Sequence, residues 1–243
     1  MFDHVTIYVP DRDASASFFD TVLIQLGIET SYRTNSFSEW DDFSLTHSDD
    51  DHPLTTGLHV GFAAPTREHV DAFWQAGVDA GYLDDGPPGP RVEYLPDYYG
   101  SFLRSPDGNS IEAVHYSDVP HRTGIVDHLW IRVADLAAST AFYRLVADRL
   151  GLSIQERPGR TTVHGADGGS FSLLEGEPTE NVHMAFATDD NAVVDRFHAE
   201  LTGAGYRDYG APGERPRYHP GYYAAYVLDP DGHNIEAVNH NRT

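Results

Sequence analysis

The sequence predicts an α+β fold made of four similar units, each a strand followed by a helix and further strands. The first observation behind this prediction is a repeat, in which segments of the first half recur in the second half 124 positions later. The second is the pattern inside each copy, where strand periodicity gives way to helix periodicity and back, and then does so again. With 243 residues and 40% hydrophobic side chains, the chain can bury a substantial core.

The first unit begins with a strand and a helix. Residues 4–9 alternate between aliphatic and other side chains, which predicts a strand with His4 on the face opposite the aliphatic residues. Asp11 or Asp13 can cap the following helix, whose apolar residues recur every four positions until Gly27 ends it. Polar-rich strands complete the unit.

The second unit opens with a strand at His59. A helix then begins near Thr66 and ends around residues 77–81. After a loop rich in proline and glycine, two strands pair across Asp107-Gly108, a strong hairpin signal between strand-like runs.

The second half repeats both units, so the chain divides into two domains of about 120 residues, a common domain size. The join lies near Ser117 to Gly124, a stretch that contains Pro120 and no apolar run. We therefore predict domains at residues 1–118 and 123–243, with two units in each.

The formal net charge of −22 limits the classes of partner. All basic side chains are arginine, and so acidic a surface repels nucleic-acid phosphates. Such a surface is typical of halophilic proteins, whose repulsion is screened by high salt, although an ordinary acidic protein is the alternative. We therefore expect small-molecule chemistry without nucleic acid.

The chain has no cysteine, which excludes disulfides, thiolate metal sites and a cysteine nucleophile. No stretch approaches the roughly 18 consecutive apolar residues of a membrane span, and Met1 leads directly into a strand pattern. We expect a cytoplasmic protein without a membrane partner, and a homodimer is compatible with the sequence.

Two histidines and one glutamate recur on equivalent predicted strands of both halves. They are His4, His59 and Glu112 in the first half, and His128, His183 and Glu236 in the second. A lone histidine on a strand is more often a core or surface group, but a complete set retained twice favours metal binding. Two imidazoles and one carboxylate hold a divalent metal and leave coordination positions open, as in non-haem Fe(II) and catalytic zinc sites. We expect His128, His183 and Glu236 to converge on one ion, with the first-half set as a second site.

This order of units resembles the vicinal oxygen chelate superfamily, which includes glyoxalase I, extradiol ring-cleaving dioxygenases, epimerases and bleomycin-resistance proteins. The resemblance extends from Phe2 to Val238 and rests on the strand-initial histidines and on the Asp-Pro-Asp-Gly-x-x-Ile-Glu segment that ends at Glu236. In the first half Ser105 replaces the first aspartate of that segment. The resemblance implies four βαβββ modules in tandem, forming two cupped mixed-sheet domains around metals, with the layout of the two-domain extradiol dioxygenases.

The segment before Glu236 resembles the extradiol dioxygenase signature, with His219 and then Tyr226 preceding the Asp-Pro-Asp-Gly turn. The resemblance implies two catalytic roles: His219 anchors the substrate, and Tyr226 hydrogen-bonds near the chelated oxygens. Leu95 and Phe102 occupy these positions in the first half. We therefore expect the chemistry in the second half.

The best function implied by this resemblance is extradiol-type cleavage of a vicinal dioxygenated, catechol-like substrate, with Fe(II) as the favoured metal. A glyoxalase I-type site adds a carboxylate ligand near Ser44 or Ser172, and serine at both places favours the three-ligand site. A glyoxalase I-like isomerase or lyase, with Zn, Ni or Mn, is the alternative enzyme, and a ligand-sequestering protein like the bleomycin-resistance members is the alternative of another class. Tyr98-Tyr99 and Tyr222-Tyr223, in equivalent loops, either line the pocket mouth or pack in the core.

Overall fold

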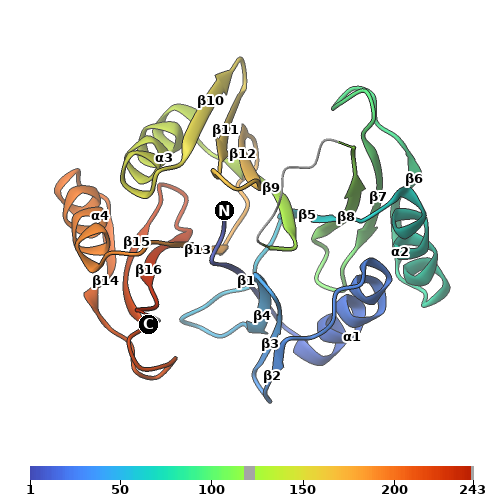
Figure 1. Ribbon diagram of the computed structural model, residues 1–243, viewed down its shortest axis with the longest axis horizontal. Coiled ribbons are helices and arrows are strands. Elements are labelled where there is room, and N and C mark those ends of the chain that lie inside the picture. The colour runs from blue at the N-terminus through green and yellow to red at the C-terminus, as the bar shows by residue number, and fades with distance from the viewer. Residues whose placement is uncertain (118–123, 242–243) are drawn as a thin grey trace.

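The computed structural model describes residues 1–117 and 124–241. In this part of the chain, four α-helices accompany two eight-stranded mixed sheets (Figure 1). The fold is therefore α+β, as predicted, and its elements follow the order of four βαβββ modules. Most of the predicted join, residues 118–123, lies outside the described residues. No helix in the described ranges is long and apolar enough to cross a membrane.

Modules 1 and 2 make up the first half. Module 1 consists of β1 (His4–Val9), α1 (Arg12–Leu23), the 3-10 helix η1 (Ile24–Leu26), β2 (Tyr32–Arg33), β3 (Phe37–Trp40) and β4 (Phe43–His47). Module 2 consists of β5 (His59–Ala63), α2 (Arg67–Asp79), β6 (Leu83–Pro90), β7 (Tyr99–Arg104) and β8 (Ser110–His115). Asp11 caps α1 by accepting the Ala14 N–H at 3.0 Å, and Gly27, at φ 77°, ends the helical segment, as predicted.

Modules 3 and 4 make up the second half. Module 3 consists of β9 (Val126–Val133), α3 (Leu136–Leu150), β10 (Ser153–Arg157), β11 (Arg160–His164) and β12 (Ser170–Glu175). Module 4 consists of β13 (His183–Ala187), α4 (Asn191–Gly203), β14 (Arg207–Glu214), β15 (Tyr223–Leu228) and β16 (Asn234–Asn239). Asp135 caps α3 with its side chain, so the same local signal begins the equivalent helix in both halves.

Each sheet contains one module from each half of the chain. Within a module the first strand pairs in parallel with the last, and two modules join where their first strands pair antiparallel, β1 with β13 and β5 with β9. The strand orders are therefore β14-β15-β16-β13-β1-β4-β3-β2 and β10-β11-β12-β9-β5-β8-β7-β6. Module 1 shares a sheet with module 4, and module 2 shares a sheet with module 3.

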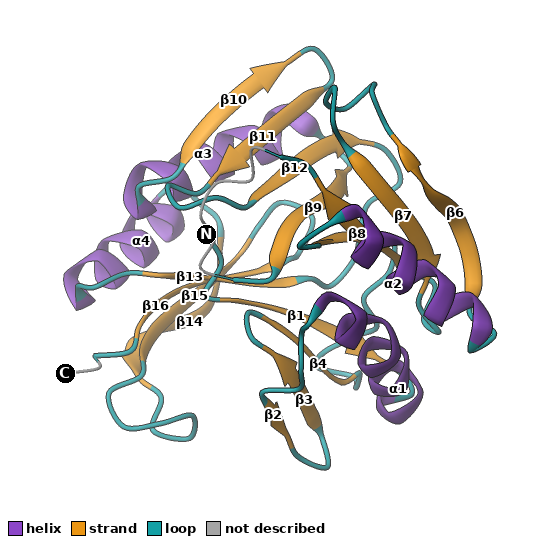
Figure 2. Ribbon diagram, turned by 45° about the vertical axis from the view of Figure 1, so that its right-hand side comes forward, coloured by secondary structure: helices purple, strands orange, loops and turns teal. Residues whose placement is uncertain are grey.

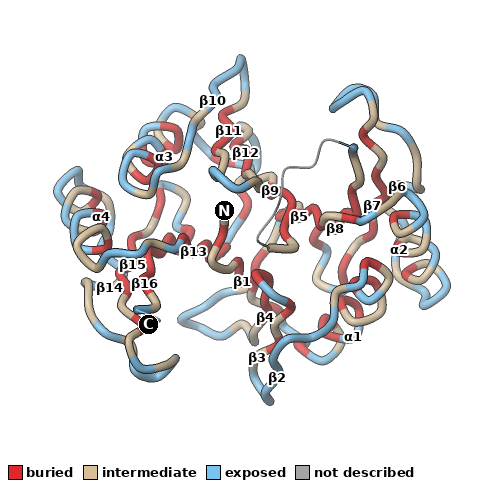
Figure 3. Tube along the Cα trace, in the orientation of Figure 1, coloured by how far each residue is buried: buried red, intermediate tan, exposed pale blue. Residues whose placement is uncertain are grey.

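The hydrophobic core lies between the sheets and under the helices. Aromatic rings connect the two sheets within each half, with Phe43 of β4 5.1 Å from Phe62 of β5, and Phe171 of β12 6.2 Å from Phe186 of β13. The helices pair within halves, α1 with α2 and α3 with α4 (Figure 2). Buried residues accordingly gather along the central strands and the inner helix faces (Figure 3). Equivalent helix positions of the two halves, Phe18 with Phe142 and Phe73 with Phe197, are all fully buried.

Candidate metal centres

His4, His183 and Glu236 form the first cluster, which we call site 1. His4 lies at the start of β1, His183 at the start of β13 and Glu236 in β16. The Nε2 atom of His183 lies 3.0 Å from Nε2 of His4 and 3.0 Å from Oε2 of Glu236. The third separation, from His4 Nε2 to Glu236 Oε2, is 3.6 Å. Three ligand atoms therefore surround one point.

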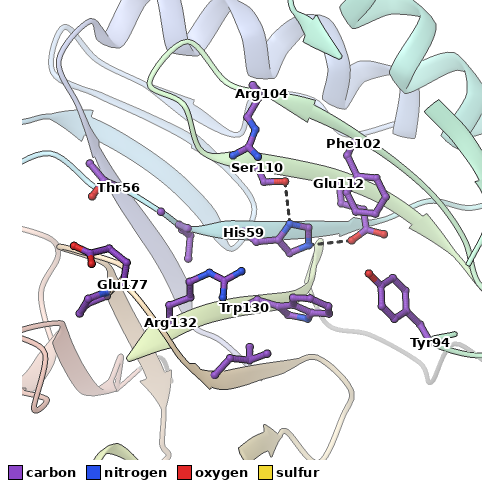
Figure 4. A pocket seen from close by; sticks show the side chains of 14 residues that line it. Thr56, His59, Tyr94, Phe102, Arg104, Ser110, Glu112, Trp130, Arg132 and Glu177 are labelled. Atoms are coloured by element: carbon purple, nitrogen blue, oxygen red, sulfur yellow. Dashed lines mark hydrogen bonds and ion pairs between the residues drawn. The ribbon is translucent and has the colours of Figure 1, made fainter. Parts of the chain in front are cut away.

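His59, Glu112 and His128 form the second cluster, site 2. They lie in β5, β8 and β9. The Nε2 atom of His59 lies 3.0 Å from Glu112 Oε2 and 3.2 Å from His128 Nε2, and the separation from His128 Nε2 to Glu112 Oε2 is 3.3 Å. His59 and Glu112 line a cavity of about 480 Å³, and both side chains are drawn in Figure 4.

The predicted grouping of His128, His183 and Glu236 around one ion is wrong. All six side chains do gather into two sets of three, but His4 joins the second-half pair and His128 joins the first-half pair. The physical reason is strand pairing, since β1 is antiparallel to β13 and β9 is antiparallel to β5. Each cluster therefore takes one histidine from one half and a histidine with a glutamate from the other.

The chemistry of both donor sets fits a divalent metal. Asp3 accepts from Nδ1 of His4 at 2.8 Å, and Asp127 accepts from Nδ1 of His128 at 2.7 Å, which leaves each Nε2 free to bind an ion. Carboxylates that orient ligand histidines in this way are common around protein metals. The two glutamates are only 1% exposed, so a cation would balance a charge that is otherwise costly to bury.

The surroundings shift the pKa values of the cluster residues. Burial raises the pKa of Glu112, but hydrogen bonds and charge from His128 and His59 lower it more, to about 2. Burial likewise opposes the net lowering of the Glu236 pKa by His183 and His4. Both glutamates are therefore ionised at neutral pH, the form that binds a metal.

A family model for the glyoxalase/bleomycin resistance protein/dioxygenase superfamily matches residues 1–113 and 125–237. The chain belongs to this superfamily. No curated protein matches the sequence. Among solved structures, glyoxalase I from Zea mays has a TM-score of 0.70 at 19% identity, over 98% of this chain and 92% of that one. A "putative dioxygenase" from Bacillus subtilis subsp. subtilis str. 168 has a TM-score of 0.66 at 12% identity, over 99% of this chain and 85% of that one. At these identities the likeness shows the fold alone.

In each site, a tyrosine hydroxyl donates a hydrogen bond to the glutamate. Tyr98 donates its hydroxyl to Glu112 Oε1 at 2.8 Å, and Tyr222 donates to Glu236 Oε1 at 2.6 Å. In both pairs the other carboxylate oxygen, Oε2, faces the histidines. Burial and the glutamate charge raise both tyrosine pKa values, so the phenols stay donors. Sequence reasoning found these equivalent tyrosines but not this contact.

Tyr226 lines the site 1 cavity, which has a volume of about 390 Å³. Its ring lies 6.3 Å from the ring of His183. The hydroxyl is buried and has no hydrogen-bond partner among the described residues. Burial and the charge of Glu236 raise the Tyr226 pKa. Phe102 lies near His59 at the equivalent place of site 2, so only site 1 offers this phenol.

His219 contacts residues behind the ligands of site 1. Its Nε2 lies 2.8 Å from Nδ1 of His240, and Nε2 of His240 lies 2.7 Å from Asp3 Oδ1. Asp3 in turn orients His4. His219 is thus connected to the metal centre through two residues, and its predicted role as a direct substrate anchor stays a prediction. At site 2, Tyr116 donates to Asp127 at 2.8 Å in place of His240.

The fourth-ligand positions of a glyoxalase I-type site carry only hydroxyls. Ser44 bonds to Thr6 at 2.7 Å, and Ser172 accepts from Arg160 at 2.7 Å. In the described part of the chain, each cluster thus contains one carboxylate. A second carboxylate, Glu39, pairs in register with Ser44 and lies on the same face of the sheet, outside the cluster.

Proposed function

We propose that this protein is a metal-dependent enzyme for a small substrate with two neighbouring oxygens, and that site 1 performs extradiol-type ring cleavage with Fe(II). The observation that carries the proposal is the buried hydroxyl of Tyr226, which lies in the cavity of a three-ligand set near Glu236 and has no hydrogen-bond partner among the described residues. A three-ligand set leaves coordination positions for a chelating substrate and a second reactant.

A cation held by His4, His183 and Glu236 would lower the pKa of a substrate hydroxyl, and Fe(II) would add redox chemistry with O2. The protein's own side chains position the ligand atoms through hydrogen bonds. Tyr222 fixes Glu236 through Oε1, and Asp3 fixes the tautomer of His4 through Nδ1. These contacts keep the ligand atoms directed at one point.

Tyr226 is the hydrogen-bond donor to the substrate. Its raised pKa keeps the phenol protonated through the physiological range, so it stabilises negative charge on a substrate oxygen. Site 2 lacks this group because Phe102 replaces it. The catalytic centre is therefore site 1, with His4 in the position that we first gave to His128.

A metal-dependent isomerase or lyase of the glyoxalase I type is the second candidate, and Glu39 favours it. This half-buried carboxylate lies on the face of site 1, where burial raises its pKa. A carboxylate in such surroundings suits a general base that removes a proton from carbon beside a carbonyl.

The test is metal analysis of anaerobically purified protein, followed by initial rates with catechol and with a hemithioacetal. The proposal expects bound iron and O2 consumption with catechol, and Tyr226→Phe should lower turnover about 100-fold or more at unchanged metal content. Tyr218→Phe is the matched control, because Tyr218 lines the same cavity but is 54% exposed. Zinc or nickel with hemithioacetal turnover that depends on Glu39 would favour the isomerase, and bound metal without either turnover would favour sequestration.

A further inference from the structure

The two sites have the same types of metal ligand. They differ in a row of three side chains that are register partners on neighbouring strands of each sheet. At site 2, Leu174 of β12 pairs in register with Arg160 of β11 on one side and with Arg132 of β9 on the other. These three side chains therefore share one face of the sheet. The corresponding row at site 1 consists of Phe37, Thr46 and Tyr8. In this row, site 2 has two arginines at the places where site 1 has Tyr8 and Phe37. The arginines that line the site 1 cavity, Arg215 and Arg217, come from another part of the chain.

Arg132 points into the site 2 cavity. It lies four positions beyond the ligand His128 on β9, and strand alternation puts both side chains on the same face. Figure 4 shows its guanidinium directed toward His59 and Trp130. Arg132 lines the cavity together with Leu174, and it forms no ion pair with any described residue.

Arg160 is a second cation without a carboxylate among the described residues. Its guanidinium donates to hydroxyls only, to Thr162 at 3.2 Å and to Ser172 at 3.0 and 2.7 Å. It also lies 5.2 Å from the centre of the Trp130 ring, which belongs to the cavity wall. Burial and the charge of Arg157 lower the pKa of Arg160.

Uncompensated arginines are unexpected in a chain with 38 acidic and 16 basic residues. Arg132 is exposed and Arg160 is partly buried. A carboxylate would give either guanidinium charge-assisted hydrogen bonds, which are stronger than those with neutral hydroxyls. The adjoining wall is aromatic, with Tyr94 5.6 Å from Trp130 at an interplanar angle of 82°. The cavity thus combines a metal-ligand set, Arg132 and flat apolar surfaces with the paired Arg104 and the carboxylate of Glu177. Arg160 lies against the Trp130 ring of this wall.

We infer that site 2 binds a small aromatic carboxylate, with the carboxylate on Arg132 and Arg160 and the ring against Trp130 and Tyr94. The inference rests on the proposed function for metal binding at site 2, and on the arginine row for the anionic end of the ligand. It assigns to site 2 a ligand class through two arginines whose places are taken by Tyr8 and Phe37 at site 1.

The test is calorimetry with phenylacetate and its uncharged counterpart 2-phenylethanol, at constant ionic strength because salt screens the interaction. Neither probe has vicinal oxygens, so the result does not depend on turnover. We expect the wild-type protein to bind phenylacetate at least 10-fold more tightly than 2-phenylethanol, and Arg132→Gln or Arg160→Gln to remove that preference. Arg104→Gln is the matched control, because Arg104 lines the same cavity but already pairs with Asp85 at 2.9 Å; it should retain the preference.

Equal affinity for the two probes, or a preference that survives both arginine substitutions, would overturn the inference. Binding that disappears after chelator treatment but withstands Arg132→Gln would also overturn it, because the carboxylate would then be held by a metal. Loss of metal binding or turnover with the phenylacetate preference intact would instead count against the proposed function alone.

Discussion

Gly61→Ala should remove the metal from site 2 without changing any ligand. Gly61 of β5 is the register partner of His128 in β9. A Cβ atom at this position would lie 2.3 Å from Cε1 of His128 and 2.6 Å from its Nδ1. The imidazole therefore packs directly on the glycine backbone, and this close approach is what directs its Nε2 toward His59 and Glu112.

The size of the effect follows from these distances. Ordinary carbon contacts lie at about 3.5 Å or more, so the ring would have to retreat by more than about 1 Å. Metal–ligand distances tolerate only about 0.2 Å, so the shift is several times larger than the site can absorb. Crowding of this kind costs about 1 to 3 kcal/mol of folding stability, so we expect the variant to remain folded.

The assay is metal content per chain after equilibrium dialysis, with circular dichroism as the check on folding. We expect two metals in the wild type and one in Gly61→Ala. The matched control is Ala185→Gly, since Ala185 is the register partner of His4 and already carries a Cβ atom. That variant should keep both metals. A folded Gly61→Ala protein with two metals at unchanged affinity would show that close packing on Gly61 does not position His128.

Three further predictions concern single side chains. Tyr226→Phe deletes a buried hydroxyl that lacks a partner among the described residues, so thermal unfolding without ligand should show unchanged or higher stability, and a loss above about 1 kcal/mol would mean that the hydroxyl is bonded. His240→Phe removes a hydrogen bond to Asp3 and should weaken metal binding at site 1 about 10- to 100-fold in a metal titration, whereas His240→Tyr, which copies Tyr116 of site 2, should restore most of it. Burial raises the pKa of Asp42 to about 6 despite its backbone hydrogen bonds, so its ionisation costs the folded state about 3 kcal/mol above pH 6, and this stability is regained as the pH falls toward 4. Asp42→Asn should therefore stabilise the protein at pH 8 and not at pH 4 in urea unfolding, and an equal change at both values would exclude this origin.

The repeat predicted the modules and the six cluster residues because both depend on local patterns. Alternation along β1 and β13 fixes which face carries His4 and His183, and both histidines do lie on the face of a cluster. Asp11 and Gly27 likewise fixed the ends of the first helical segment. These features follow from neighbours in the sequence.

The grouping of the ligands could not be read from the same patterns. Periodicity gives the face of a strand but not the strand that pairs with it, and β1 pairs with β13 rather than with β5. The contacts of Tyr98 and Tyr222 with the glutamates lie within one module, across the β7–β8 and β15–β16 hairpins, but both tyrosines lie in loops whose conformation periodicity does not give. The sequence indicated equivalent tyrosines, and only the fold assigned them an acceptor.

The metal content of the double variant His4→Ala/Glu236→Ala tests most directly the claim that each metal centre combines both halves of the chain. In the structure these residues belong to one cluster, with His4 Nε2 3.6 Å from Glu236 Oε2. We predict that the double variant loses one metal and keeps the other, held by His59, Glu112 and His128. A folded double variant that retains no metal would contradict it, because each substitution would then have emptied a separate site within its own half.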